Sequence, residues 1–301
     1  MQHYIFILLL FTLTTVQPVR AQSADSLAEL KGHSFRVFYS YDQQERAETI
    51  AVRIDKATAF HQQLLGFKPT VTVFILSAKD WQAYTSEPVV YGMPHYNDKH
   101  KKLIVAAEDN PFWKSFLPPV DQLPQELREP VRSTYTGTDG HLTAQAFFDL
   151  LAIHELGHAF HIQGGLTMQR KWMGELYCNI LLHTYIVEKE PGLLPALTLF
   201  PRMVVAGGTK GFKYTSLADA HEHYNELGQQ YPRNYGWYQC RWHSAAAGIY
   251  DTAGKNVCKK LWDAFITQKE ILADAALLSF ISAADKTVAD MINNWDRDTI
   301  K

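Results

Sequence analysis

The segment AIHELGHAFH, residues 152–161, contains the pattern H-E-x-x-H inside an otherwise apolar run. From Thr143 to Gln163 the apolar residues recur at spacings of three and four, which predicts a largely buried helix. We expect Thr143 to cap this helix and Gly164-Gly165 to end it. The helix decides which way the polar side chains of the pattern point.

Two histidines of the pattern share one face of this helix. His154 and His158 are one turn apart, about 5–6 Å from each other, so both rings can reach one tetrahedral metal ion. Glu155 is rotated by about 100° and is better placed to hold a water that the metal binds than to share the metal. A random chain of this composition would contain the pattern with a probability of about 0.03, so a third ligand has to be found.

The nearest further histidine is not expected to be that ligand. His161 lies within about 40° of the other two on the helix wheel, but its ring starts roughly 10 Å along the axis from His154. Convergence of all three rings is therefore disfavoured. We interpret His161 as a packed histidine or as a hydrogen-bond partner of a ligand.

A carboxylate on the next helix is the better candidate. Residues 171 to about 187 form a second helical pattern, ended by Pro191-Gly192, and apolar residues cover nearly all of it. Glu175 is thus a carboxylate in a buried helix, where an unpaired charge costs several kcal/mol or becomes protonated. A metal cation would remove that cost. The alternative is that Glu175 lies in the first turn and complements the helix dipole, which is worth about 0.3–1 kcal/mol.

The longer pattern H-E-x-x-H-x-x-G-x-x-H, typical of metzincins, does not occur, because His161 stands at its glycine and Gly164 at its last histidine. The residues instead resemble the gluzincins, the thermolysin-like and aminopeptidase-like zinc peptidases. The resemblance rests on His154-Glu155-x-x-His158, on Gly174-Glu175 and on Asn179, and it covers about residues 143–190.

This resemblance implies a ligand set. It makes Glu175 the third zinc ligand, beside His154 and His158, and it makes the residue four positions later the partner that orients the first histidine. That residue is commonly Asp in the family, and here it is Asn179, whose side-chain carbonyl can still accept a ring N–H.

The N-terminus is typical of an export signal. Tyr4 to Val16 is a short apolar stretch, and Val19-Arg20-Ala21 places small residues where a signal peptidase reads. We expect residues 1–21 to be a signal peptide cleaved after Ala21 and the protein to be periplasmic or secreted. An uncleaved anchor is the alternative, because the charged region ahead of the apolar stretch is weak.

The remaining composition is that of a globular protein. Of the 301 residues 47% are hydrophobic and 20% charged. Removing Arg20 with the signal leaves 28 Lys and Arg against 31 Asp and Glu, a net charge of −3, so nucleic acid is not expected as a partner. No other segment is expected to cross a membrane. Cys178 is expected to be a buried thiol, and in an exported protein Cys240 and Cys258 could pair.

The organisation of the chain changes near residue 140. Before it, runs at 34–39, 70–76 and 102–106 predict strands and 47–65 predicts a helix; after it the patterns are almost entirely helical. We predict an α+β fold with a small α/β lobe at 22–140 and a helical lobe at 141–301, joined through a Pro-rich connector. By resemblance the fold is zincin-like, with the zinc between the lobes. Residues 103–106 are then either the edge strand that lines the cleft or a core strand.

A third region, residues 221–243, is rich in aromatic and donor-bearing side chains. A zinc peptidase needs a donor aimed at the oxyanion that forms when water attacks a carbonyl. Tyr235 is the favoured candidate, with Tyr238 and His243 as competitors and Asn234 as the expected cap of a helix that begins there. Packing of these aromatics onto the core is the commoner explanation of such a region.

Two functions of different classes remain. The first is a zinc-dependent hydrolase, a metallopeptidase acting on peptides or proteins, with Glu155 as general base. The second is a non-enzymatic exported protein that keeps a structural metal or a degenerate zincin fold. A structural site is closed by four protein ligands, and Cys178 is the only spare ligand near Glu175. Glu155 favours the enzyme, because a structural site has no use for a carboxylate beside its first ligand.

Overall fold

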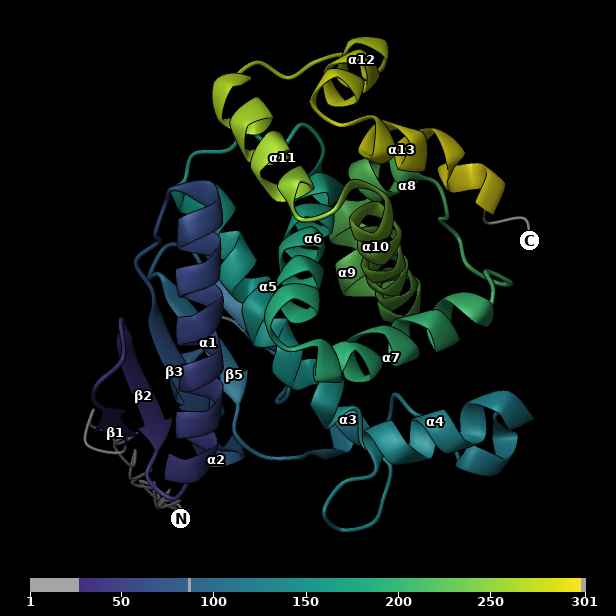
Figure 1. Cartoon of the computed structure of the whole chain (residues 1–301). Coiled ribbons are helices and arrows are strands. Elements are labelled where there is room, and N and C mark those ends of the chain that lie inside the picture. Colours follow the sequence, from purple (N-terminus) through teal and green to yellow (C-terminus); the bar gives the residue numbers. More distant parts are fainter. Residues whose placement is uncertain (1–26, 86–87, 299–301) are drawn as a thin grey trace, which may run out of the picture.

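The computed structural model describes residues 27–85 and 88–298. The expected signal peptide, residues 1–21, lies outside them. The N-terminal part is a mixed sheet with two helices, and the rest of the described chain is helical, so the fold is α+β as predicted (Figure 1). Its elements are β1 (Leu27–Leu30), β2 (Arg36–Ser40), α1 (Gln44–Leu65), β3 (Thr72–Leu76), α2 (Ala78–Tyr84), β4 (His95–Asn97) and β5 (Lys102–Ala106).

The five strands lie in the order β1-β2-β3-β5-β4. β2, β3 and β5 are parallel, and β1 and β4 pair antiparallel at the two edges. The interpretation of 103–106 as an edge strand is therefore wrong and that of a core strand is right. Leu103–Ala106 are buried because β5 has a neighbour on each side. The edge strand at this side of the sheet is β4, which no pattern in the sequence indicated.

Helices α1 and α5 (Gln145–Gln163) cover one face of the sheet side by side. α1 contacts β1 and β2, α5 contacts β4 and β5, and the two helices contact each other. α1 buries Ala47, Ile50, Ile54 and Ala57 on one face and ends at Gly66, whose positive φ of 77° suits a residue without a side chain. The histidine helix α5 therefore lies against the edge of the sheet that β4 forms.

The helical part packs around α6 (Lys171–Lys189), which contacts α5 on one side and α10 (Pro232–Ala253) on the other (Figure 1). Almost every residue of α6 is buried, as the sequence predicted. The further helices are α3 (Pro111–Lys114), α4 (Gln125–Tyr135), α7 (Leu194–Ala206), α8 (Leu217–Glu222), α9 (Tyr224–Gln230), α11 (Asn256–Thr267), α12 (Asp274–Ala284) and α13 (Lys286–Asp298), with short 3-10 turns at Val120–Gln122 and Pro191–Leu193.

Two predicted caps are corrected. The N-cap of α5 is Ala144, without a side-chain bond; the Thr143 hydroxyl accepts from the N–H of Gln145 at 3.2 Å and donates to Asp109 at 2.6 Å. α10 begins at Pro232, because proline suits the first helical position, so Asn234 lies inside the first turn. The Asn234 side chain instead pairs with the backbone of residue 214.

All three cysteines are free and buried, so Cys178 is the buried thiol that was expected and the pair Cys240–Cys258 does not form. The Cys258 thiol instead donates to the Thr184 hydroxyl of α6 at 3.3 Å.

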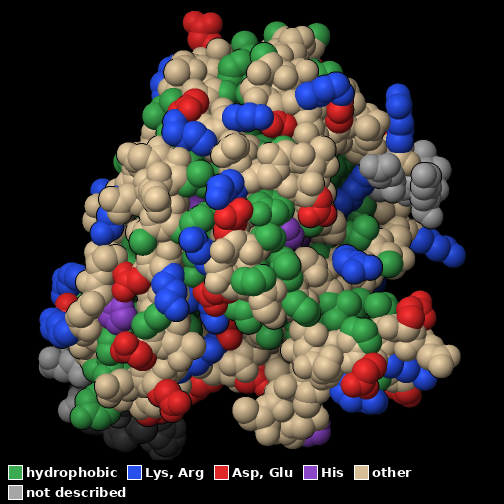
Figure 2. Space-filling model, viewed as in Figure 1, with side chains coloured by type: hydrophobic (Ala, Val, Ile, Leu, Met, Phe, Trp, Pro, Cys, Tyr) green, Lys and Arg blue, Asp and Glu red, His purple; other side chains and the backbone are tan. Residues whose placement is uncertain are grey.

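The surface carries both charges. Figure 2 shows Lys and Arg interspersed with Asp and Glu over the visible face. Within residues 27–85 and 88–298 no helix is long and apolar enough to cross a membrane.

Candidate metal centre

The backbones of α5 and α6 approach closely at one glycine. A Cβ at Gly157 would lie 3.0 Å from the Cys178 sulfur and 3.1 Å from the Cys178 Cα. Real Cβ contacts are rarely that short, so a side chain at 157 would have to push α6 away. The glycine inside H-E-x-x-H therefore lets His154 and His158 meet the side chains of α6.

Gly157→Val is expected to separate the two helices, because Cys178 contributes backbone as well as sulfur to the contact. Overpacking of this kind typically costs about 1–3 kcal/mol of stability, and zinc uptake should fall with it. Denaturant unfolding and a metal titration measure both quantities. In the matched control, Gly248→Ala on α10, nothing lies within 4 Å of the new methyl group, so the stability should rise by up to about 1 kcal/mol. A Gly157→Val protein as stable as its parent would contradict the close approach.

Acceptor atoms of three residues converge between α5 and α6. The Nε2 atoms of His154 and His158 are 3.2 Å apart. Glu175 brings Oε2 to 3.1 Å from His154 Nε2 and Oε1 to 3.7 Å from His158 Nε2. Ligands of one tetrahedral zinc are about 3.3 Å from each other, as follows from bonds of about 2.0–2.1 Å. His154 and Glu175 are buried, and the His158 side chain is 18% exposed.

The neighbour of His154 bears on how the ring meets Glu175. The His154 Nδ1 lies 2.8 Å from the Asn179 Oδ1, a carbonyl oxygen that can only accept, so the ring hydrogen is on Nδ1. A protonated ring then donates from Nε2 to a carboxylate oxygen of Glu175, whereas a neutral ring directs the lone pair of Nε2 at it. Two acceptors 3.1 Å apart repel unless a proton or a metal ion lies between them. The expected contact between Asn179 and the first histidine is present.

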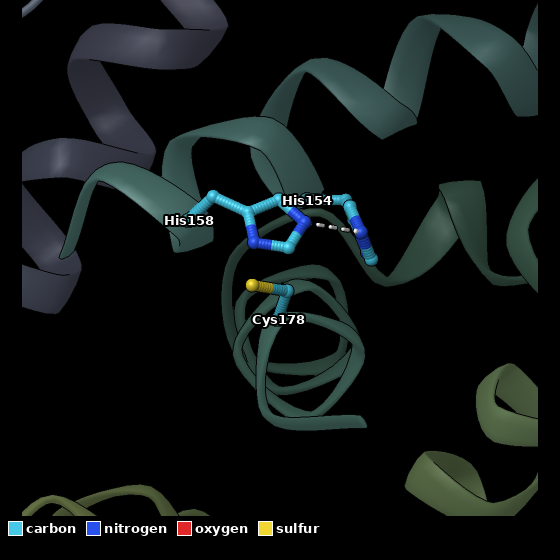
Figure 3. Close-up of side chains that lie close together, drawn as sticks. All are labelled: His154, His158 and Cys178. Carbon is cyan, nitrogen blue, oxygen red and sulfur yellow. Dashed lines mark hydrogen bonds between the residues drawn. The ribbon is translucent and has the colours of Figure 1, made fainter. Parts of the chain in front are cut away.

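Cys178 belongs to the same group. Ligand atoms of His154, His158 and Cys178 lie within 4.8 Å of one another, and this buried cluster could hold a metal ion (Figure 3). Figure 3 shows the two rings side by side on α5, with the Cys178 sulfur on α6 below the ring of His158. Burial raises the pKa of the thiol well above its usual value, and the charges of Glu175 and Glu155 raise it further. In this structure Cys178 is therefore a protonated thiol.

Glu175 is the ionised group of the centre. Burial opposes its ionisation, but the charge of His158 and hydrogen bonds with both histidines hold its pKa well below the usual value. The Tyr224 hydroxyl donates to Oε1 at 2.6 Å and the Gln239 amide to Oε2 at 3.0 Å. Glu175 is thus not the unpaired charge that the sequence suggested. The dipole alternative also fails, because α6 has no acidic residue in its first turn.

Glu155 stands beside this centre and meets the edge strand. The backbone N–H of Tyr96, the middle residue of β4, donates to its carboxylate, and the side chain is half-buried. Burial raises the pKa of Glu155 to about 8; the charge of Glu175 adds to this, whereas the charge of His154 and the Tyr96 N–H oppose it. Glu155 is therefore a stronger base than an exposed carboxylate.

Of the two tyrosines singled out in residues 221–243, Tyr235 contacts the partners of Glu175 and Tyr238 does not. The Tyr235 hydroxyl accepts from the Gln239 amide at 2.8 Å and lies 3.4 Å from the Tyr224 hydroxyl. Burial and the charge of Glu175 raise its pKa. Tyr238 instead donates to the Ser216 carbonyl at 2.7 Å and packs against Trp237 and Trp242. This is the packing onto the core that was the commoner explanation of the region.

The other histidines and two further donors complete the surroundings. The His243 ring centroid lies 6.1 Å from that of His154, and His161 Nε2 lies 3.0 Å from His158 Nδ1. The sequence did not indicate Tyr224 and Gln239 as partners of Glu175. Tyr224 lies in the aromatic region, and Gln239 follows Tyr235 by one helical turn, but only the tertiary structure joins them to α6.

Two pockets of the structure lie away from this centre. One of about 730 Å³ runs along the outer face of α1 to Glu190, and one of about 350 Å³ is lined by residues 29–36. Comparisons of the chain with protein-family models, with curated proteins and with solved structures found no match. The assignment of function therefore rests on the chemistry of the centre.

Proposed function

We propose that the protein is a zinc-dependent hydrolase, most simply a gluzincin-like metallopeptidase. In this proposal His154, His158 and Glu175 bind one zinc ion and Glu155 is the general base. The observation that carries it is the convergence of acceptor atoms from three residues, at distances of 3.1–3.7 Å, with the carboxylate of Glu155 beside them and outside the proposed ligand set.

His154, His158 and Glu175 would hold the zinc ion, which would supply an acidified water and polarise the carbonyl group of the substrate. Glu155 then takes a proton from the attacking water and passes it to the leaving amine, which is the usual task of a general base that becomes a general acid. Burial raises its pKa, which makes the carboxylate a stronger proton acceptor when it is ionised. The backbone N–H of Tyr96 holds the carboxylate in place.

The proposal also indicates where a peptide substrate would bind. The free side of β4 faces Glu155, because the N–H of Tyr96 points to that carboxylate. A peptide that lies along β4 in extended conformation would pass the general base, as in recognition by strand addition. Tyr235, next to Glu175 through Gln239, is the candidate donor to the oxyanion, a contribution worth about 2.7–4 kcal/mol where it has been measured.

One observation favours the second candidate function, an exported protein with a structural metal. The Cys178 thiol lies in the same cluster, and a thiolate there would close the site with a fourth protein ligand. The raised pKa of Cys178 weighs against it, because a thiol must lose its proton to bind a metal.

The protein loaded with metal should contain one zinc ion per chain, since three protein ligands and one water complete a tetrahedral site. Metal analysis after gel filtration measures the stoichiometry. Incubation with a mixed peptide library, followed by mass spectrometry of the products, tests the activity and shows the preferred side chains. A folded protein that takes up no zinc would contradict the site, and a loaded protein that cleaves no peptide would contradict the peptidase.

A further inference from the structure

Each ligand histidine has its own partner on the nitrogen that faces away from the centre. Asn179, on α6, pairs with Nδ1 of His154 at 2.8 Å. His161, on α5 itself, pairs with Nδ1 of His158 at 3.0 Å, with the two rings inclined by 63°. His161 therefore lies behind His158 and not beside the converging acceptors, which excludes it from the ligand set while His158 keeps this orientation.

The two imidazoles can share one hydrogen in two ways. If Nδ1 of His158 carries it and donates to Nε2 of His161, the Nε2 of His158 has a free lone pair for a metal. If Nε2 of His161 donates instead, the hydrogen of a neutral His158 moves to its Nε2, where it blocks the metal. Only the first arrangement fits a ligand at position 158.

The ring of His161 is fixed by its surroundings. It is buried, and a Cβ at Gly174 would lie 3.5 Å from both its Cε1 and its Nε2. These are ordinary contact distances, so the His161 ring packs against α6 at Gly174, immediately before Glu175. The accepting nitrogen is held there while it faces His158.

We infer that His161 is a positioning residue that accepts the Nδ1 hydrogen of His158 and so keeps His158 in the tautomer that binds zinc. The inference rests on the proposed zinc site but not on peptide cleavage. In this inference each partner accepts the Nδ1 hydrogen of one ligand histidine, Asn179 that of His154 and His161 that of His158. Partners of this kind are typically worth about 10–100-fold in metal affinity or activity.

Three variants test the inference through zinc affinity, measured by competition with a chelator. His161→Phe keeps a ring but loses the acceptor, and its affinity should fall about 10–100-fold. His161→Gln restores a carbonyl acceptor and should recover part of the loss. His183→Phe is the matched control: His183 is also buried, on α6, with its ring against Tyr250 and not against a ligand. Its zinc affinity should equal that of the parent.

Nitrogen NMR of the histidines supplies a readout that general loss of stability would not change. In the parent with zinc, Nδ1 of His158 should carry a hydrogen with the shift of a strong hydrogen bond, and in His161→Phe that shift should disappear. Unchanged affinity in His161→Phe, or a hydrogen on Nε2 of His158 in the loaded parent, would overturn the inference and leave the hydrolase standing. A parent that binds zinc but cleaves no peptide would remove the hydrolase alone. A parent that binds no zinc would remove both.

Discussion

Glu155→Gln is expected to retain zinc and to lower the turnover of peptide by about 10²–10⁴-fold, the usual contribution of a general base. The amide has nearly the same size and can still accept from the backbone N–H of Tyr96 through its carbonyl oxygen. It cannot take the proton of the attacking water. Because Glu155 is not a ligand in the proposed site, the metal content should stay at one zinc per chain.

The kinetics should locate the effect. Loss of an interaction made only in the transition state lowers kcat and kcat/KM together and leaves KM nearly unchanged. Glu222→Gln, which changes an exposed carboxylate on α8, is the control and should turn over peptide at the parental rate. Retained activity in Glu155→Gln would remove the base from the mechanism, and loss of zinc from it would place Glu155 among the ligands.

The two helices of the centre were predictable from local pattern. The apolar spacings of three and four predicted the start of α5 to within two residues. The apolar residues on nearly all sides of α6 predicted that Glu175 is buried. The pairing of His154 with Asn179 follows from the resemblance, because residues 175 and 179 are one turn apart on α6 and face α5 together. The two helices needed only periodicity, whereas the partner of His154 came from the resemblance.

The rest depended on tertiary structure. β4 has three residues, all half-buried, so it shows no alternation that would mark it as a strand, and its place beyond β5 is set by the hairpin that returns at residues 98–101. The partners of Glu175 come from α9 and α10, 49 and 64 residues further along the chain. Asn234 was mistaken for a cap because a favourable side chain was given more weight than Pro232 two positions earlier.

Glu175→Ala and Cys178→Ala should separate the two candidate functions. If Glu175 is the third ligand, its loss leaves two histidines and should weaken zinc affinity far more than the loss of Cys178 or Asn179 from the same helix. Cys178→Ala should leave the affinity near that of the parent, since Cys178 lies outside the proposed ligand set and its raised pKa opposes the loss of the thiol proton. Asn179→Ala should fall between them, with a loss of about 10–100-fold.

The removal of Glu175 has a second effect, on stability. It removes one acceptor from the Tyr224 hydroxyl and one from the Gln239 amide, which keep only their contacts with the Tyr235 hydroxyl, so the fold should lose about 0.5–1.5 kcal/mol for each bond. Tyr224→Phe is the control, because it breaks the 2.6 Å hydrogen bond and keeps the carboxylate. If Tyr224→Phe keeps zinc while Glu175→Ala loses it, the loss belongs to the ligand. If Cys178→Ala releases zinc and Glu175→Ala does not, a thiolate closes the site, and the exported protein with a structural metal becomes the better account of the chain.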